Sequence, residues 1–529
     1  MANDYLWWQT GIVYQVYPRS FMDSDGNGVG DLPGIESKLD YLKWLGVKAV
    51  WISPCYRSPM KDFGYDVSDY CDIDPLFGTM ADLDRLLVET HARGMKLIMD
   101  FVPNHTSDQH PWFIESRSSR DNPKRDWYIW KDAKPGGEPP NNWLANFGGI
   151  AWTWDAKTEQ FDYHAFLAEQ PDLNWRDPEV QSAMMNVLRF WLNKGVDGFR
   201  VDVMNHLIKD AEFRDNPINP GWKPGDHPYR RLIPVYSADR PEVHEIVAMM
   251  RQTFDAYDER VIIGEIYLPI ERLVTYYGAH GDGAQLPFNF QLVTKPWKAR
   301  VIAATIDRYE AALAPDDWPN WVLGNHDRPR IASRIGPAQA KVAAMLLHSL
   351  RGTPTMYQGD EIGMEDVYIP PDKVVDPPGV TIGEGRDPER TPMQWDASPN
   401  AGFTAAAEPW LPVAPDYASR NVAVERDDPG SILSLYKHLI ELRQSEPALK
   451  VGSYRPVPAE GDLLVYIREH AGERFLAALN LGHKAQTVVT DPACHGHIAI
   501  STHLDREGEK VAGTIELRAD EGVLVRLDA

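Results

Sequence analysis

Short apolar runs alternate with longer helical patterns through most of this 529-residue chain, and no other feature constrains the fold as strongly. Each apolar run has the length and the β-branched or aromatic content of a buried strand, and a helical period follows it. Strands that are connected through helices lie parallel in one sheet. Eight such units predict an α/β fold built on a (β/α)8 TIM barrel. The predicted strands span residues 12–17, 49–52, 97–101, 198–202, 261–265, 284–291, 321–325 and 353–357.

The alternation breaks at two places, and each break predicts a further domain. Residues 105–174 are rich in Trp, Pro, Gly and Asn and lack a helical period, which predicts an irregular inserted domain after strand three. After residue 450 the chain changes to short strands separated by turns, at 463–467, 475–479, 498–500 and 522–525. This pattern predicts a C-terminal antiparallel β-sandwich over 451–529. The barrel then comprises residues 1–104 and 175–450.

Composition excludes several classes of protein. The formal net charge of −23 disfavours binding to nucleic acid or to an anionic membrane surface. Cys55, Cys71 and Cys494 are odd in number and have no C-x-x-C spacing, so we expect free thiols and no zinc site. The N-terminal residues do not resemble a signal peptide, and no apolar run reaches the ~18–20 residues of a membrane span. We therefore expect a cytoplasmic enzyme, either monomeric or homodimeric, without an organic cofactor.

Charged residues cluster where the predicted strands end. Barrel enzymes keep their reactive groups at the carboxyl ends of their strands, and here these ends carry Asp100, Arg200, Asp202, Glu265 and Asp327. For any one of these acids, a capping or ion-pair role would be the simpler interpretation. That interpretation weakens when four strand ends carry such groups together.

Two of these acids suit glycoside cleavage, which needs one carboxylate as nucleophile and one carboxyl group as proton donor. Arg200 shares a strand face with Asp202, so we expect its charge to lower the pKa of Asp202 and keep it ionised. Glu265 stands between Ile263 and Ile266, and we expect this apolar environment to favour its protonated form.

Short motifs around these acids resemble the signature regions of the α-amylase family of glycoside hydrolases. The first-strand and last-strand motifs of that family are matched by GIVYQVYPRSF at 11–21 and GTPTMYQG at 352–359. Two further segments, QPDLN at 170–174 and GRDPERTPMQW at 385–395, are similar to the oligo-1,6-glucosidase and α-glucosidase branch. The four core signatures are matched by DFVPNH at 100–105, GFRVD at 198–202, GE at 264–265 and NHD at 325–327.

The resemblance implies roles for the catalytic residues. Asp202 would be the nucleophile and Glu265 the general acid/base, about 5–5.5 Å apart as in retaining enzymes. Asp327 would be a third carboxylate that holds sugar hydroxyls, and Arg200 would orient the nucleophile.

It also implies a pocket for one non-reducing glucose. His105 and His326 would bind hydroxyls of that glucose, Asp62 and Tyr65 would contact its non-reducing end, and Arg386 would close over it. Phe147, Phe166 and Gln170 fit the pocket wall, although a role in the core of the inserted domain is the alternative for these three.

The activity that follows is a retaining, exo-acting α-glucosidase for short α-glucosides, working by double displacement. In this branch a valine after the nucleophile, here Val203, is associated with α-1,6 activity. The alternative is a β-branched core residue. We expect cleavage of α-1,6 bonds, with α-1,4 activity alongside.

The acidic loop DSDGNGVGD at 23–31 has the spacing of a calcium loop, with oxygen-bearing side chains at positions 1, 3, 5 and 9. Gly34 stands where an EF-hand has its bidentate glutamate, so the loop is no EF-hand. It is similar to the structural calcium loop of the α-glucosidase branch. The resemblance implies a structural Ca²⁺ without catalytic function, and the alternative is an Asx-rich turn without metal. The implied ligands are Asp23, Asp25, Asn27, Val29 and Asp31.

Three other functions remain open. A glucosyltransferase or isomerase for sucrose- or trehalose-type disaccharides would keep the same site. Trehalose-6-phosphate hydrolysis would need a phosphate-binding cluster, which the sequence does not reveal. An inert relative, such as the heavy chain of an amino-acid transporter, would have a membrane span and would have lost catalytic acids, whereas this chain keeps all three.

Overall fold

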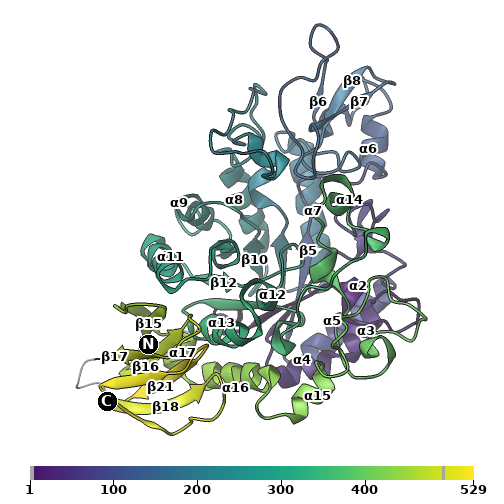
Figure 1. Ribbon diagram of the computed structural model, residues 1–529. Helices are drawn as coiled ribbons and strands as arrows, with labels where there is room; N and C mark the ends of the chain where they lie inside the picture. Colours follow the sequence, from purple (N-terminus) through teal and green to yellow (C-terminus); the bar gives the residue numbers. More distant parts are fainter. Residues whose placement is uncertain (1–4, 491–494, 529) are drawn as a thin grey trace.

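The computed structural model describes residues 5–490 and 495–528, and its centre is a sheet of eight parallel strands (Figure 1). The strand order is β11-β10-β9-β5-β2-β1-β13-β12, which is the sequential order of a TIM barrel, and this confirms the predicted fold. The barrel strands are β1 (Val13–Val16), β2 (Ala49–Ile52), β5 (Lys96–Phe101), β9 (Gly198–Val201), β10 (Val261–Gly264), β11 (Leu286–Pro287), β12 (Asn320–Val322) and β13 (Thr353–Tyr357).

The sixth and seventh barrel strands, β11 and β12, meet at a seam that a side chain bridges. β11 is only two residues long, much shorter than the predicted 284–291, because Pro287 has no N–H to donate to a ladder. The Asn320 amide donates to the Pro287 carbonyl at 2.6 Å and accepts from the Asn289 N–H at 3.0 Å. This asparagine thus replaces backbone pairing between the two strands.

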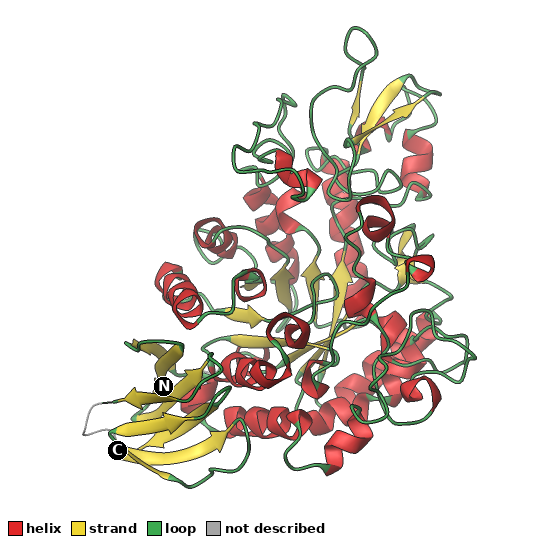
Figure 2. Cartoon of the chain, viewed as in Figure 1, coloured by secondary structure: helices red, strands yellow, loops and turns green. Residues whose placement is uncertain are grey.

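Helices cover the outside of the strands (Figure 2). The sequence sets their ends: in α7, the Asp177 carboxylate accepts the Glu179 N–H at 2.7 Å, and Gly195 ends the helix at φ 103°. Residues 32–45 form two helices and not one, because the backbone at Lys38 leaves the helical conformation. The principal barrel helices are α3 (Leu32–Ser37), α4 (Leu39–Leu45), α5 (Met80–Ala92), α7 (Pro178–Lys194), α8 (Val243–Phe254), α9 (Ile270–Leu273), α11 (Ala299–Ala312), α12 (Ile331–Ile335), α13 (Pro337–Ser349) and α16 (Ile432–Ser445).

Between β5 and α7 the chain leaves the barrel and forms a separate small unit. It contains α6 (Pro111–Ser116) and an antiparallel sheet of β6 (Trp130–Lys131), β8 (Gln160–Tyr163) and β7 (Trp152–Asp155). The end of this segment returns beside its start, where the Leu173 N–H donates to the Asn104 carbonyl at 2.9 Å. The return brings Gln170 close to His105 at the barrel mouth.

The C-terminal part forms an eight-stranded antiparallel sheet with two apolar faces. Side chains such as Tyr466 and Phe475 face the barrel. Val488 and Ile515, near one end of the sheet, share a buried cluster with Val465 near the other, so the sheet curls into two layers. Its strands are β14 (Ser453–Val457), β15 (Leu463–His470), β16 (Glu473–Asn480), β17 (Gln486–Val489), β18 (His495–Ser501), β19 (Lys510–Ala512), β20 (Thr514–Leu517) and β21 (Gly522–Leu527).

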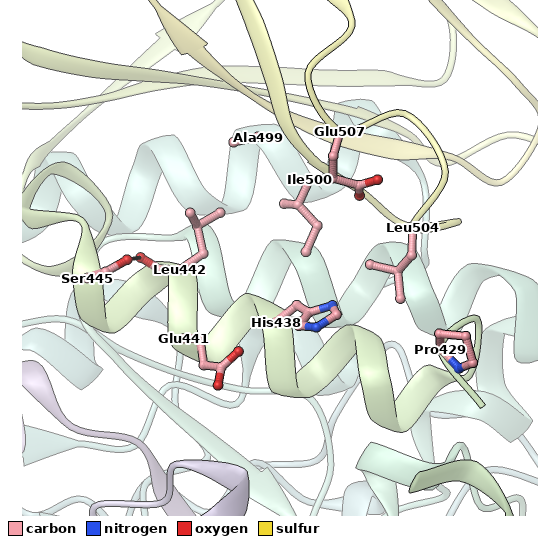
Figure 3. A pocket seen from close by; sticks show the side chains of 9 residues that line it. All are labelled: Pro429, His438, Glu441, Leu442, Ser445, Ala499, Ile500, Leu504 and Glu507. Carbon is pink, nitrogen blue, oxygen red and sulfur yellow. Dashed lines mark hydrogen bonds between the residues drawn. The ribbon is translucent and has the colours of Figure 1, made fainter. Parts of the chain in front are cut away.

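A cavity of about 550 Å³ lies between α16 and this sheet (Figure 3). Its lining is mostly aliphatic, with Leu442, Ile500 and Leu504 around His438. The catalytic candidates follow barrel strands instead, so this cavity is not the predicted site.

Two of the three cysteines lie in the described part of the chain. Cys55 and Cys71 are free, and Cys494 lies outside the described residues. No helix within 5–490 and 495–528 has the length and apolar character needed to cross a membrane.

Candidate active site

The three predicted catalytic acids lie together at the carboxyl ends of the barrel strands. Asp202 directly follows β9 and Glu265 directly follows β10, and these strands pair with Val201 opposite Gly264. Asp202 is 6% exposed and Glu265 is 4% exposed. Asp327 follows β12, and its side chain is 20% exposed. The barrel therefore places two acids side by side and a third across the mouth.

One guanidinium connects the first two acids. Nη1 of Arg200 donates to Asp202 at 2.7 Å and to Asp100 at 2.8 Å, and Nη2 contacts Oε2 of Glu265 at 2.7 Å. The Val203 N–H donates to the same Oε2 at 2.8 Å. Asp100 joins the group because β5 and β9 pair with Asp100 opposite Arg200. Three carboxylates thus share one cation.

This sharing reverses the direction expected for the pKa of Asp202. Burial raises the pKa of Asp202 well above its usual range, Arg200 opposes this, and the charges of Glu265 and Asp100 add to the rise. Burial also raises the pKa of Asp100, to about 7. Arg200 does act to lower the pKa of Asp202, as expected, but one arginine does not offset burial and two other carboxylates, so the net shift is upward.

The environment of Glu265 also differs from the apolar one expected. Ile263 and Ile266 are both buried, but Oε2 of Glu265 receives the Arg200 guanidinium and the Val203 N–H. Asp202 and Glu265 therefore do not differ as expected, with one acid in a polar site and the other in an apolar site.

Asp327 contacts two arginines and a histidine. Its Oδ1 lies 2.8 Å from Arg390 and 3.1 Å from Arg386, and its Oδ2 lies 3.3 Å from Nε2 of His326. Burial alone would raise the pKa of Asp327, but His326, Arg386 and Arg390 together lower it below its usual range. Asp327 is therefore the carboxylate that stays ionised most readily.

Arg386 closes one end of the site through three carboxylates. Besides Asp327 it contacts Asp62 at 2.7 Å and Asp376 at 2.7 Å, and its guanidinium carbon lies 4.9 Å from the centre of the Phe147 ring. These contacts join the loop after β2 to the long loop after β13. These ion pairs place Arg386 where it could close over the non-reducing glucose, as the resemblance implied.

Gln170 and two phenylalanines lie along one wall. The Gln170 amide is fully buried and contacts Asp62 at 3.0 Å and His105 at 3.1 Å. The Phe166 ring lies 5.3 Å from His105 and 5.4 Å from Phe147. Both phenylalanines are half-buried, which favours the pocket wall over the core of the inserted segment.

The second histidine, His326, lies in a polar stack at the bottom of the site. The Tyr65 hydroxyl lies 2.8 Å from Nε2 of His326, and the Gln15 amide nitrogen lies 2.7 Å from its Nδ1. Burial lowers the pKa of both His105 and His326, so both rings are neutral near pH 7. A neutral imidazole can accept or donate a hydrogen bond to a sugar hydroxyl.

Val203 has an unusual backbone. Its φ is 37° and its ψ is 46°, a left-handed conformation that costs a β-branched residue on the order of 1–3 kcal/mol. The N–H of Val203 donates to Glu265, so this backbone links the residue after the predicted nucleophile to the predicted acid/base. The side chain is half-exposed beside both acids.

Four further residues belong to this network: Asp100, which the sequence placed at a strand end without a role, and Asp376, Arg390 and Gln15, which were not among the predicted site residues. Asp100 and Arg390 stand inside recognised motifs, and Gln15 lies within the first strand, so positional signals existed for these three. Asp376 lies in an irregular loop without any such signal.

The predicted calcium loop brings its acids together. Ligand atoms of Asp23, Asp25 and Asp31 all lie within 4.8 Å of one another. Ca²⁺ takes oxygen ligands at about 2.3–2.6 Å, so oxygens on opposite sides of the ion lie about 5 Å apart, and this cluster fits. Gly26 and Gly28 have φ of 79° and 92°, which make the turns.

The other two implied ligands take part in the same turn. The Asn27 side-chain oxygen accepts the Val29 N–H at 2.8 Å, which is an Asx turn. Asn27 is exposed and Val29 is half-exposed. The loop is thus shaped by local hydrogen bonds around a cluster of hard oxygen donors.

Comparison with known proteins gives a consistent result. The model of the alpha amylase catalytic domain family matches residues 15–452. A probable alpha-glucosidase of Rhizobium meliloti is 41% identical over 96% of both chains. An oligo-1,6-glucosidase of Heyndrickxia coagulans is 41% identical over 90% of this chain and 92% of its own. The crystal structure of an alpha-glucosyl transfer enzyme superposes with a TM-score of 0.94 at 40% identity, over 99% of this chain and 100% of its own.

Proposed function

The chain belongs to the α-amylase family of glycoside hydrolases, and from this we propose that it is a retaining, exo-acting α-glucosidase for short α-glucosides. One observation carries the proposal. The carboxylates of Asp202 and Glu265 contact adjacent nitrogens of the Arg200 guanidinium. Two acids held so closely suit the ~5–5.5 Å separation of retaining enzymes.

In the first step Asp202 attacks the anomeric carbon of the glucose while Glu265 protonates the leaving oxygen. A covalent β-glucosyl ester forms on Asp202, and the leaving sugar departs with its proton. For this step Asp202 must be ionised and Glu265 must carry the proton, and the Arg200 guanidinium contacts both groups. The ionised Asp327 holds sugar hydroxyls and favours the distorted transition state.

In the second step Glu265 acts as the base. It takes a proton from water, which attacks the ester and releases α-glucose, and Asp202 regains its charge. Because both steps invert the anomeric carbon, the product keeps the α configuration. Arg200 orients both acids throughout.

Exo action is supported by the closed end of the site. Arg386 connects Asp62, Asp327 and Asp376 across the loops behind the glucose position. A chain that continued beyond the non-reducing glucose would have to break these ion pairs. His105, His326 and Tyr65 would bind hydroxyls of that glucose, and Phe147, Phe166 and Gln170 would complete its wall.

We propose that α-1,6 bonds are cleaved, with α-1,4 bonds as further substrates. The support is Val203, whose strained backbone fixes its side chain beside Glu265. Because Glu265 protonates the leaving oxygen, a residue beside it meets the leaving sugar. The 41% identical oligo-1,6-glucosidase is consistent with this preference.

We propose that the loop 23–31 holds a structural Ca²⁺ through Asp23, Asp25, Asn27, Asp31 and the Val29 carbonyl. The ion would neutralise the clustered acids and stabilise the first barrel loop. A chelator should lower the melting temperature of wild type, and re-added Ca²⁺ should restore it. An Asp25→Asn variant should lose this response, whereas a wild type that ignores both reagents would exclude the ion.

Glucosyl transfer or isomerisation is a second candidate function. It is favoured by the structural match to an alpha-glucosyl transfer enzyme with a TM-score of 0.94. In that reaction a sugar hydroxyl replaces water in the second step, and the same residues serve.

A substrate panel tests the proposal. Maltose, isomaltose, sucrose, trehalose and maltotriose would be supplied separately, and released glucose and new disaccharides would be quantified. We expect glucose from isomaltose at the highest kcat/KM. Isomerised or transferred products as the main result would favour the second candidate, and inactivity on every α-glucoside would refute the proposed function.

A further inference from the structure

Arg200, Arg328, Arg386 and Arg390 lie around the three catalytic acids, and Arg328 differs from the other three. Arg200, Arg386 and Arg390 each contact at least two carboxylates. Arg328 forms no ion pair with any residue in the parts of the chain that the structure describes, 5–490 and 495–528. Its charge is therefore not committed to a protein carboxylate.

The position of Arg328 is fixed by aromatic contacts. Its guanidinium carbon lies 5.0 Å from the centre of the Tyr267 ring, and that ring stacks on Phe290 at 4.1 Å with an interplanar angle of 14°. The Asn325 amide also donates to the Tyr267 hydroxyl at 3.3 Å. A flat stack thus supports the guanidinium. Arg328 as a whole residue is half-exposed, and its Nε is buried without a hydrogen-bond partner among the described residues.

This stack stands beside the predicted acid/base. Tyr267 follows Glu265 by two residues and Arg328 directly follows Asp327. Burial would lower the pKa of Arg328, but Tyr267, Asp327 and Glu265 raise it, so it stays a cation within electrostatic reach of both acids. In glycoside cleavage the leaving oxygen lies at the acid/base, which places Arg328 next to the leaving group.

We propose that Arg328, supported by Tyr267, binds hydroxyl groups of the leaving sugar and so selects neutral, polyhydroxylated leaving groups. This rests on the proposed α-glucosidase function. A guanidinium presents parallel N–H donors, which match two neighbouring hydroxyl oxygens. The residue thereby determines leaving-group specificity and takes no part in bond cleavage.

The charges of the site decide against an anionic leaving group. Arg200, Arg386 and Arg390 contact six carboxyl groups between them. With Glu265 protonated for the first step, five carboxylates still face the four arginines, and this excess of negative charge repels a carboxylate or phosphate. An aryl leaving group is disfavoured too, because Phe290 and Arg328 already cover the Tyr267 ring. The six carboxyl groups are Asp62, Asp100, Asp202, Glu265, Asp327 and Asp376.

The test compares two substrates that share the glucose but differ in the leaving group. Isomaltose releases a second glucose as its leaving group, whereas methyl α-D-glucoside releases methanol. Both leaving groups need protonation, but methanol offers no further hydroxyl to Arg328. Arg328→Gln should lower kcat/KM for isomaltose about tenfold, mainly through KM, and for methyl α-D-glucoside less than twofold. Arg328→Lys keeps the charge but loses the planar guanidinium, so its kcat/KM for isomaltose should lie between those of wild type and Arg328→Gln.

Arg189→Gln is the control, because Arg189 is exposed on α7, where it donates to the Asn186 side chain at 2.9 Å. Melting temperatures of all variants check their folding. If Arg328→Gln does not fold, the comparison rests on Arg328→Lys and on Tyr267→Phe, which keeps the ring stack.

Three outcomes would overturn the inference. Equal losses on both substrates, with a displaced pH profile, would mean that Arg328 acts through Glu265. An unchanged isomaltose KM would mean that it does not touch the leaving sugar. Wild type that cleaves α-1,6-glucosyl gluconate faster than isomaltitol would prefer an anionic leaving group over a neutral one, which contradicts the proposed selection. Wild-type inactivity on every α-glucoside would instead refute the proposed function.

Discussion

The glucose side and the leaving-group side of the site are built differently. On the glucose side, Arg386 and Arg390 bind Asp62, Asp327 and Asp376 in a connected set of ion pairs. On the leaving-group side, Val203, Tyr267 and Arg328 are all half-exposed, and Arg328 has no ion pair with any described residue. The two catalytic acids stand between these halves.

This difference separates two tasks of the enzyme. A connected set of ion pairs holds its members within narrow limits, which suits the recognition of one invariant sugar. Half-exposed residues with few partners can be exchanged without breaking such a set. We therefore expect substitutions on the glucose side to affect every substrate, and those on the leaving-group side to change the ratio between substrates.

The largest effect is expected at the boundary between the halves. Asp202→Asn removes the nucleophile and should lower kcat on every α-glucoside by about 10³-fold or more. Steady-state rates on isomaltose and maltose measure it, with Asp84→Asn, an exposed aspartate paired with Lys194, as the control. Substantial activity in Asp202→Asn would remove the nucleophile assignment.

Arg386→Met tests the ion pairs of the glucose side. It leaves Asp62 and Asp376 without their shared partner, and kcat/KM should fall about 10²-fold. Because the change is on the glucose side, isomaltose and methyl α-D-glucoside should lose equally. A loss confined to one of them would contradict the division of the site.

Asp100→Asn probes the shared arginine. Burial and then the charges of Glu265 and Asp100 raise the pKa of Asp202 against Arg200, so the loss of the Asp100 charge should lower that pKa. The nucleophile must be ionised, so the acid limb of kcat/KM should move to lower pH, by up to about one unit. A limb that stays or moves upward would show that Asp100 does not influence Asp202.

Val203→Thr should have the smallest effect. Both residues are β-branched and must adopt the same strained backbone, so folding should change little. The ratio of kcat/KM for isomaltose over maltose should fall about fivefold, while the sum of the two activities stays similar. An unchanged ratio would place linkage preference elsewhere on the leaving-group side.

The sequence predicted the site residues at strand ends better than those on the loops above the barrel. Strand ends are readable because apolar runs stop at them, and Asp202, Glu265 and Asp327 followed from position and motif. Asp376 and Arg328 could not be found in this way, since their roles depend on which loops meet above the barrel. The limits predicted for the inserted domain, 105 and 174, stay a prediction.

Charge states were also out of reach of the sequence. Arg200 stands beside Asp202 on β9, and neighbours along the chain suggested a simple pair. The parallel register adds Asp100 from β5 and Glu265 from β10, so that burial and repulsion outweigh one cation. Only the assembled barrel brings these three carboxylates to one arginine.

The most direct test of the central claim is the anomeric configuration of the first product. Proton NMR spectra recorded during the first minutes of isomaltose hydrolysis, before mutarotation, would distinguish the two anomers of the glucose released from the non-reducing end. Double displacement through Asp202 and Glu265 predicts α-glucose, with the β anomer appearing only as the solution equilibrates. Initial release of β-glucose would contradict the retaining mechanism and the roles assigned to both acids.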